Sequence, residues 1–204
     1  MKKVTILAIL FLCVLSAQAQ NRFRAAVIEP AAPTAETGLV RHPWTGKKVL
    51  FIGDSISDCV ASHIVDRHYY DWLSDWLGIT AYVPAISGWQ MKDVEAEVRM
   101  FQATAPGVQP DMICIFLGTN DYNSGISIGE WYTEAVEEVQ AANVWSVNVI
   151  DLHAVSGMYP ILDEDAALFY KNMDKDRLHP NEAGHRRLAE VLLYQSLVLP
   201  CRVI

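Results

Sequence analysis

Apolar runs alternate with helically spaced apolar residues along most of the chain. Four continuous runs predict strands that are buried on both faces. These runs are residues 48–52, 79–83, 112–117 and 147–152. Apolar residues three or four positions apart predict amphipathic helices at residues 69–77, 91–101, 128–143 and 188–192. This alternation predicts an α/β fold in three layers, in which helices cover both faces of a parallel sheet.

The pattern is different before residue 44. Lys2 and Lys3 precede an apolar run at residues 4–15, and small residues follow at 17–19, which is typical of a signal peptide spanning residues 1–19. The run is shorter than the roughly 20 residues that span a bilayer, so we expect a secreted or periplasmic protein without stable membrane insertion. Residues 20–43 contain three prolines without a sustained period and predict an extended arm or linker. A single domain should occupy residues 44–204.

Charge and cysteine content restrict the partners. The chain has 24 acidic and 16 basic residues and a formal net charge of −8, so we do not expect nucleic acid or anionic membrane as a partner. Cys114 lies within an apolar run and should act as a small buried hydrophobic residue. Cys59 and Cys201 could form a disulfide in an oxidising compartment.

Polar residues that can do chemistry follow the predicted strands. They are Gly53-Asp54-Ser55, Ser87-Gly88-Trp89, Gly118-Thr119-Asn120-Asp121 and, further on, Asp176-Arg177-Leu178-His179. Because ligands of such sheets bind beyond the carboxyl ends of the strands, these segments should lie close together. Together they contain a hydroxyl nucleophile, an imidazole base, an orienting carboxylate and hydrogen-bond donors for an anion.

This ordered set resembles the four blocks of the SGNH hydrolases, the GDSL-type esterase and lipase superfamily, over residues 47–195. The resemblance implies a flavodoxin-like three-layer sandwich and a serine esterase. Ser55 would be the nucleophile, His179 the general base and Asp176 the residue that orients the imidazole. The resemblance also implies an oxyanion hole, formed by the backbone amides of Ser55 and Gly88 and the side-chain amide of Asn120.

Each of these residues also has a purely structural explanation. Ser55 or Asp54 could cap a helix, Gly88 could serve a turn, and Asn120 could cap a loop. Asp54 should have a local hydrogen-bonding role. Three further residues next to the blocks could line a substrate cleft or simply pack: Trp89, Tyr122 and Asn123. The histidines show no metal-ligand spacing and the chain has no phosphate-binding glycine motif, so we expect neither metal nor cofactor.

The chain departs from the family in its middle segment. A family member usually has a further strand and helix between the asparagine block and the strand leading to the Asp-His loop. Here the helix at 128–143 is followed directly by the strand at 147–152, so we expect a sheet that is one strand narrower. A partner subunit could cover the sheet surface that this leaves bare, which makes a homodimer one expectation.

Two functions from different classes follow. The first is a secreted serine esterase that hydrolyses small acyl esters, such as acetylated carbohydrate, through an acyl-enzyme. The second is a catalytically impaired module that binds acylated glycans, which requires Ser55 and His179 to lie well apart. An acyltransferase using the same three residues is a third option.

Overall fold

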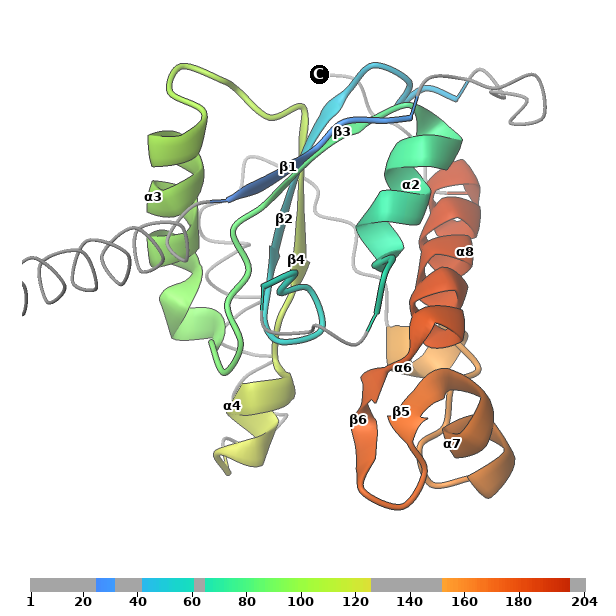
Figure 1. Cartoon of the computed structure of the whole chain (residues 1–204). Helices are drawn as coiled ribbons and strands as arrows, with labels where there is room; N and C mark the ends of the chain where they lie inside the picture. The colour runs from blue at the N-terminus through green and yellow to red at the C-terminus, as the bar shows by residue number, and fades with distance from the viewer. Residues whose placement is uncertain (1–24, 32–41, 61–64, 126–151, 199–204) are drawn as a thin grey trace, which may run out of the picture.

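The protein is built around one central sheet, with the strand order β1-β3-β2-β4 (Figure 1). We describe it from a computed structural model, which covers residues 25–31, 42–60, 65–125 and 152–198. The strands of this sheet are β1 (Ala26–Ile28), β2 (Lys48–Gly53), β3 (Thr80–Val83) and β4 (Met112–Phe116). β2 pairs in parallel with both β3 and β4, whereas β1 pairs with β3 in the antiparallel direction. The predicted α/β class is therefore confirmed, and β1 is a strand that the sequence pattern did not predict.

Helices cover both faces of this sheet, as the three-layer prediction requires. On one face lie α2 (Tyr69–Leu77) and α8 (Glu182–Val198), and on the other a 3₁₀ turn, η1 (Met91–Asp93), which leads into α3 (Val94–Thr104) (Figure 1). α2 ends as expected at Gly78, which has the left-handed backbone that glycine adopts without strain. The remaining elements are α4 (Thr119–Asn123), α6 (Leu152–Val155), α7 (Asp163–Phe169), β5 (Tyr170–Asn172) and β6 (Asp176–Pro180).

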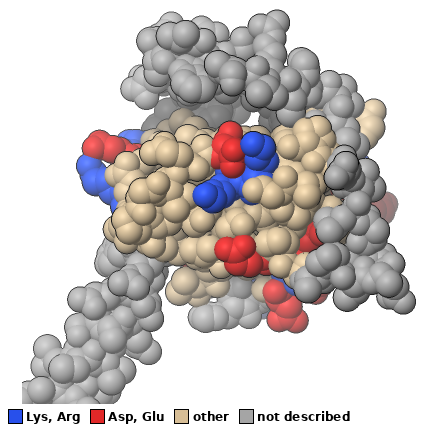
Figure 2. All heavy atoms as spheres, turned by 90° about the horizontal axis from the view of Figure 1, so that it is seen from above, with Lys and Arg blue, Asp and Glu red and all other residues tan. Residues whose placement is uncertain are grey.

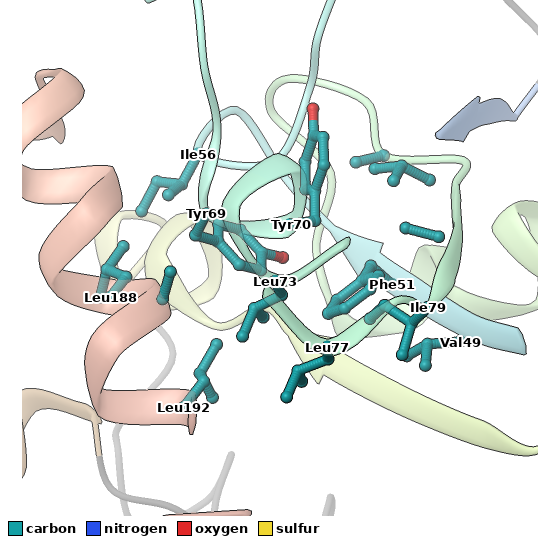
Figure 3. Packing of buried hydrophobic residues seen from close by; sticks show 14 of the residues in the cluster. Val49, Phe51, Ile56, Tyr69, Tyr70, Leu73, Leu77, Ile79, Leu188 and Leu192 are labelled. Carbon is teal, nitrogen blue, oxygen red and sulfur yellow. The ribbon is translucent and has the colours of Figure 1, made fainter. Parts of the chain in front are cut away.

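β2 shows why its apolar run is continuous. Successive side chains of a strand point to opposite faces, so Val49 and Phe51 pack towards α2 and α8, whereas Leu50 and Ile52 pack towards α3. Both faces are buried, and all four residues are at most 2% exposed. Phe51 contacts the ring of Tyr69 with the ring centroids 5.7 Å apart. Figure 3 shows the larger of the two clusters, in which side chains of β2, α2 and α8 meet.

The middle of the chain is only partly described. The helix expected at residues 128–143 and residues 147–151 of the last expected strand lie outside the described residues, and so does the expected narrowing of the sheet. Leu152, which was expected to end that strand, instead begins α6. Its carbonyl accepts the amide proton of Ser156 at 2.9 Å, and its side chain packs against the core from this helix. The apolar spacing of Leu152 and Val155 fits a helix better than a strand.

The two ends of the sheet differ in chemistry. At the amino end of β2, Asp111 accepts hydrogen bonds from the Lys47 ammonium at 2.9 Å and from the Lys48 amide at 2.8 Å. The surface at the end of the molecule opposite α4 and β6 carries acidic and basic side chains next to one another (Figure 2). The carboxyl ends of β2 and β4 face the other way, towards α4 and the β5–β6 hairpin (Figure 1). That end carries the candidate chemistry.

Three further findings concern the described residues. None of their helices is both long enough and apolar enough to cross a bilayer. Cys59 is an exposed thiol, and Cys201 lies outside the described residues, so the disulfide between them stays a prediction. Cys114 is a half-buried thiol of β4, and desolvation raises its pKa to about 12, as expected for a cysteine that acts as a hydrophobic side chain.

Candidate active site

The chain leaves β2 in a tight turn that presents Ser55. Asp54 Oδ1 accepts the amide proton of Ile56 at 3.0 Å, and the Asp54 carbonyl accepts that of Ser57 at 3.0 Å. Gly53 is needed before this turn, because a Cβ there would lie 2.4 Å from Ser57 Oγ. Residues 54–60 form turns rather than the first turn of a helix, so helix capping does not account for Ser55. Asp54 has the local role that was expected of it.

The β5–β6 hairpin brings an imidazole to this turn. His179 Nε2 lies 2.9 Å from Ser55 Oγ, across 124 positions of sequence. On the other side of the ring, His179 Nδ1 lies 3.0 Å from each carboxylate oxygen of Asp176. The carboxylate also accepts the amide protons of His179 and Leu178 at 3.0 and 3.2 Å. The structure therefore brings together the three side chains that the sequence singled out.

Hydrogen bonds determine the charge of Asp176 and the tautomer of His179. Burial alone would raise the pKa of Asp176, but hydrogen bonds from the backbone amide and the ring of His179 outweigh burial and lower this pKa. Asp176 is therefore ionised at neutral pH and accepts the Nδ1 proton of His179. With the proton on Nδ1, Nε2 is an acceptor and can receive the Ser55 hydroxyl proton.

Besides Ser55, the residues expected to form the oxyanion hole are Gly88, in a turn after β3, and Asn120, in α4. The Ile86 carbonyl accepts the Trp89 amide proton at 3.2 Å, which closes a turn in which Gly88 has φ 84°. Only glycine adopts that backbone readily, so Gly88 is required by the turn. Asn120, in the first turn of α4, donates one hydrogen of Nδ2 to the Trp89 carbonyl at 2.9 Å. An amide nitrogen has two hydrogens, and the second is the one that an oxyanion would receive.

Side chains that the sequence analysis did not select hold these segments in place. Asp58 Oδ2 accepts the amide and hydroxyl protons of Ser87, both at 2.8 Å, and so joins the Ser55 turn to the Gly88 turn. Gln90 Nε2 donates to the Asn120 carbonyl at 3.1 Å. Glu97 of α3, which is completely buried, accepts the Gly53 amide proton at 2.9 Å. Asp58 and Gln90 lie next to the recognised blocks, but nothing in the sequence pattern distinguishes Glu97.

The three residues expected to line the substrate lie in the Gly88 turn and in α4. Tyr122 is 63% exposed on α4, and Asn123 at the end of that helix is also exposed. Trp89 is half-buried, and its backbone carbonyl accepts a hydrogen bond from Asn120. Their side chains are therefore available near Asn120 but make no hydrogen bond to Ser55, His179 or Asp176.

Within the described parts of the chain, no group of three or more His, Cys, Asp or Glu side chains is placed to hold a metal ion.

Comparisons with known proteins give a family match over part of the chain and several similar solved structures. Residues 51–145 match the model of the GDSL-like lipase/acylhydrolase family. Among solved structures, a member of the lipolytic G-D-S-L family from Veillonella parvula is 18% identical with a TM-score of 0.50; the match covers 76% of this chain and 99% of that one. An acetyl xylan esterase from Geobacillus stearothermophilus is 19% identical with a TM-score of 0.48, over 78% and 98% of the two chains. No curated protein matches the sequence.

The family match begins inside β2 and includes the Ser55, Gly88 and Asn120 segments. Asp176 and His179 lie beyond it, and the structure brings them to Ser55. The resemblance seen in the sequence is confirmed: residues 51–145, a little under half of the chain, match the GDSL-like lipase/acylhydrolase family.

Proposed function

We propose that the protein is a serine esterase that hydrolyses small acyl esters through an acyl-enzyme. The observation that carries the proposal is the 2.9 Å contact between His179 Nε2 and Ser55 Oγ, with His179 held by Asp176 on its other side. A serine hydroxyl is a poor nucleophile at neutral pH unless a base removes its proton during the attack. This arrangement supplies that base in the required tautomer.

In the first half of the reaction, Ser55 Oγ attacks the ester carbonyl carbon while its proton passes to His179 Nε2. Asp176 stabilises the imidazolium that forms. The tetrahedral intermediate collapses, the bond to the alkoxy oxygen breaks, and the leaving alcohol takes the proton from His179. Ser55 is then acylated. In the second half, His179 takes a proton from water while the water oxygen attacks the acyl carbon. The bond from the acyl carbon to Ser55 Oγ then breaks, and Oγ takes the proton back from His179, which releases the carboxylic acid and free Ser55.

The negative oxygen of each tetrahedral intermediate needs donors that are already in place. The backbone amides of Ser55 and Gly88 and the second hydrogen of Asn120 Nδ2 are proposed for this role. The bond from Asn120 to the Trp89 carbonyl supports it, because it fixes the side-chain amide beside the Gly88 turn. Loss of one such donor typically lowers kcat by about 10²–10³-fold.

The alternative function is a non-catalytic module that binds acylated glycans. It required a separation of Ser55 and His179 that prevents proton transfer. A hydrogen-bonding distance of 2.9 Å supports catalysis instead.

Location and substrate class form part of the proposal. The pattern of residues 1–19 favours export to the periplasm or the outside of the cell, where acetylated polysaccharides and other extracellular esters are found. The mass of the protein purified from the exported fraction tests this: cleavage near Ala19 is expected, and an intact amino terminus would contradict export.

The activity is tested with p-nitrophenyl acetate on wild type, Ser55→Ala and Ser57→Ala. Ser57 is a matched control, because it lies in the same turn but bonds to Tyr69 rather than to His179. We expect hydrolysis by wild type and by Ser57→Ala, and loss of at least about 10³-fold in Ser55→Ala. Equal rates for wild type and a folded Ser55→Ala protein would overturn the proposal.

A further inference from the structure

A buried carboxyl group lies behind the turn that carries Ser55. Glu97 is on α3, and its carboxyl group reaches the end of β2, where Oε2 accepts the Gly53 amide proton at 2.9 Å. The side chain is completely buried. A buried carboxyl is costly to a fold, and none of the steps proposed above uses this one.

Gly53 connects Glu97 to both backbone amides that are proposed for the oxyanion hole, those of Ser55 and Gly88. The Ser55 amide follows Gly53 by two residues in the chain. The Gly53 carbonyl accepts the Ile86 amide proton at 3.3 Å, and Ile86 is the first residue of the turn that contains Gly88. Gly53 is therefore fixed at its amide by Glu97, and its carbonyl supports the Gly88 turn.

We propose that Glu97 is a positioning residue for the esterase reaction, which sets through Gly53 the placement of the Ser55 and Gly88 amides relative to the reacting carbon. This inference rests on the proposed function. Glu97 touches no reacting atom, so its effect should appear in kcat rather than in KM. A misplacement of about 1 Å in such a site can lower the rate by about 10²-fold.

The surroundings of Glu97 favour its neutral form. Asp54 faces it from the Ser55 turn, Asp93 from η1, and the phenol of Tyr69 from α2; none of these groups is a cation. Desolvation, with smaller contributions from Asp54 and Asp93, raises the pKa of Glu97 to about 8 despite the hydrogen bond from Gly53. Among the described residues, Glu97 Oε1 has no hydrogen-bond partner.

A dependence on pH follows from this. Below about pH 8 the carboxyl group is neutral and adds no charge behind the oxyanion donors. Above that pH it becomes negative behind the Gly53 amide, two residues before Ser55, where a second negative charge opposes formation of the oxyanion. The kcat of wild type should therefore fall as Glu97 ionises.

The experiment compares wild type, Glu97→Gln, Glu97→Ala and Glu95→Gln with p-nitrophenyl acetate over a range of pH. Gln keeps an oxygen acceptor for Gly53 but cannot ionise, and Glu95 is an exposed carboxylate two residues away on the same helix. Ser55→Ala measures the background at each pH. Circular dichroism shows that each variant is folded.

We expect kcat to fall by about 10-fold or more in Glu97→Ala, with KM changed by less than about threefold. Glu97→Gln should keep more activity than Glu97→Ala and lose the alkaline fall of kcat, whereas Glu95→Gln should behave like wild type. The inference is overturned if Glu97→Gln shows the same alkaline fall as wild type, or if a folded Glu97→Ala keeps its full kcat. The proposed function fails separately, when wild type is no more active than Ser55→Ala.

Discussion

Gly184 lies in the first turn of α8, where this helix packs against the segment that carries His179. A Cβ at position 184 would lie 2.2 Å from the Phe169 carbonyl oxygen and 2.8 Å from Pro180 Cβ. The same oxygen accepts the Asn181 amide proton at 2.9 Å, so it cannot move away freely. Gly184→Ala should therefore push α8 away from the β5–β6 hairpin and displace His179 relative to Ser55.

Two effects of this substitution oppose each other. Alanine in place of glycine stabilises a helix by at most about 1 kcal/mol. Overpacking a well-filled site costs about 1–3 kcal/mol, and the upper end applies here because a backbone oxygen and a proline ring cannot rotate away. A gap of 2.2 Å must open by about 1 Å to reach normal contact. We therefore expect a net loss of about 1–2 kcal/mol in stability, and a larger effect on kcat, of up to about 10²-fold.

Urea unfolding and ester hydrolysis of wild type, Gly184→Ala and Ala183→Gly test this. Ala183 is exposed in the same turn of α8, so Ala183→Gly measures helix propensity without a packing change. It should lose at most about 1 kcal/mol and keep its kcat. A Gly184→Ala protein that is more stable than wild type and equally active would refute the reasoning.

Two further predictions concern ionisable groups. Asp176→Asn should lower kcat by about 10²–10⁴-fold, because an amide does not stabilise the imidazolium of His179 and can hold the wrong tautomer; unchanged kcat would contradict the assigned role. Glu97→Gln should reduce the change in the free energy of unfolding between pH 4.5 and about 8. The reason is that Glu97 ionises near pH 4.5 in the unfolded protein and only near pH 8 in the folded protein. Wild type loses stability as pH rises through this window, by at most about 5 kcal/mol at 1.36 kcal/mol per pH unit, whereas Gln loses none by this route. Urea unfolding at several pH values measures the difference, and parallel curves for the two proteins would contradict the burial of an ionisable Glu97.

The sequence predicted the elements whose burial leaves a periodic pattern. β2 is apolar throughout because Val49 and Leu50 face different clusters, and α2 is marked by its apolar stripe and by Gly78. The chemistry around Ser55 was predictable for another reason. A nucleophile, its base and its donors are distinct residue types, placed in a fixed order after the strands of a known family.

Short elements and supporting contacts could not be predicted in the same way. β1 has three residues and pairs with β3 at the edge of the sheet, too short to show a period. β5 and β6 pair with an irregular register, and their residues mix charged and apolar types. Glu97 falls at a helix position that a solvent-facing glutamate would also occupy, so only the structure places its carboxyl group behind Gly53.

Reaction with a fluorophosphonate, followed by mass-spectrometric mapping of the adduct, tests the central claim most directly. The reagent is attacked by an activated serine, so it requires nucleophile, base and oxyanion donors at once. We predict one adduct on Ser55, none on Ser57 in the same turn, and almost none on Ser55 when His179 is replaced by Ala. A folded wild-type protein that leaves Ser55 unlabelled, or that labels equally well without His179, would contradict the account.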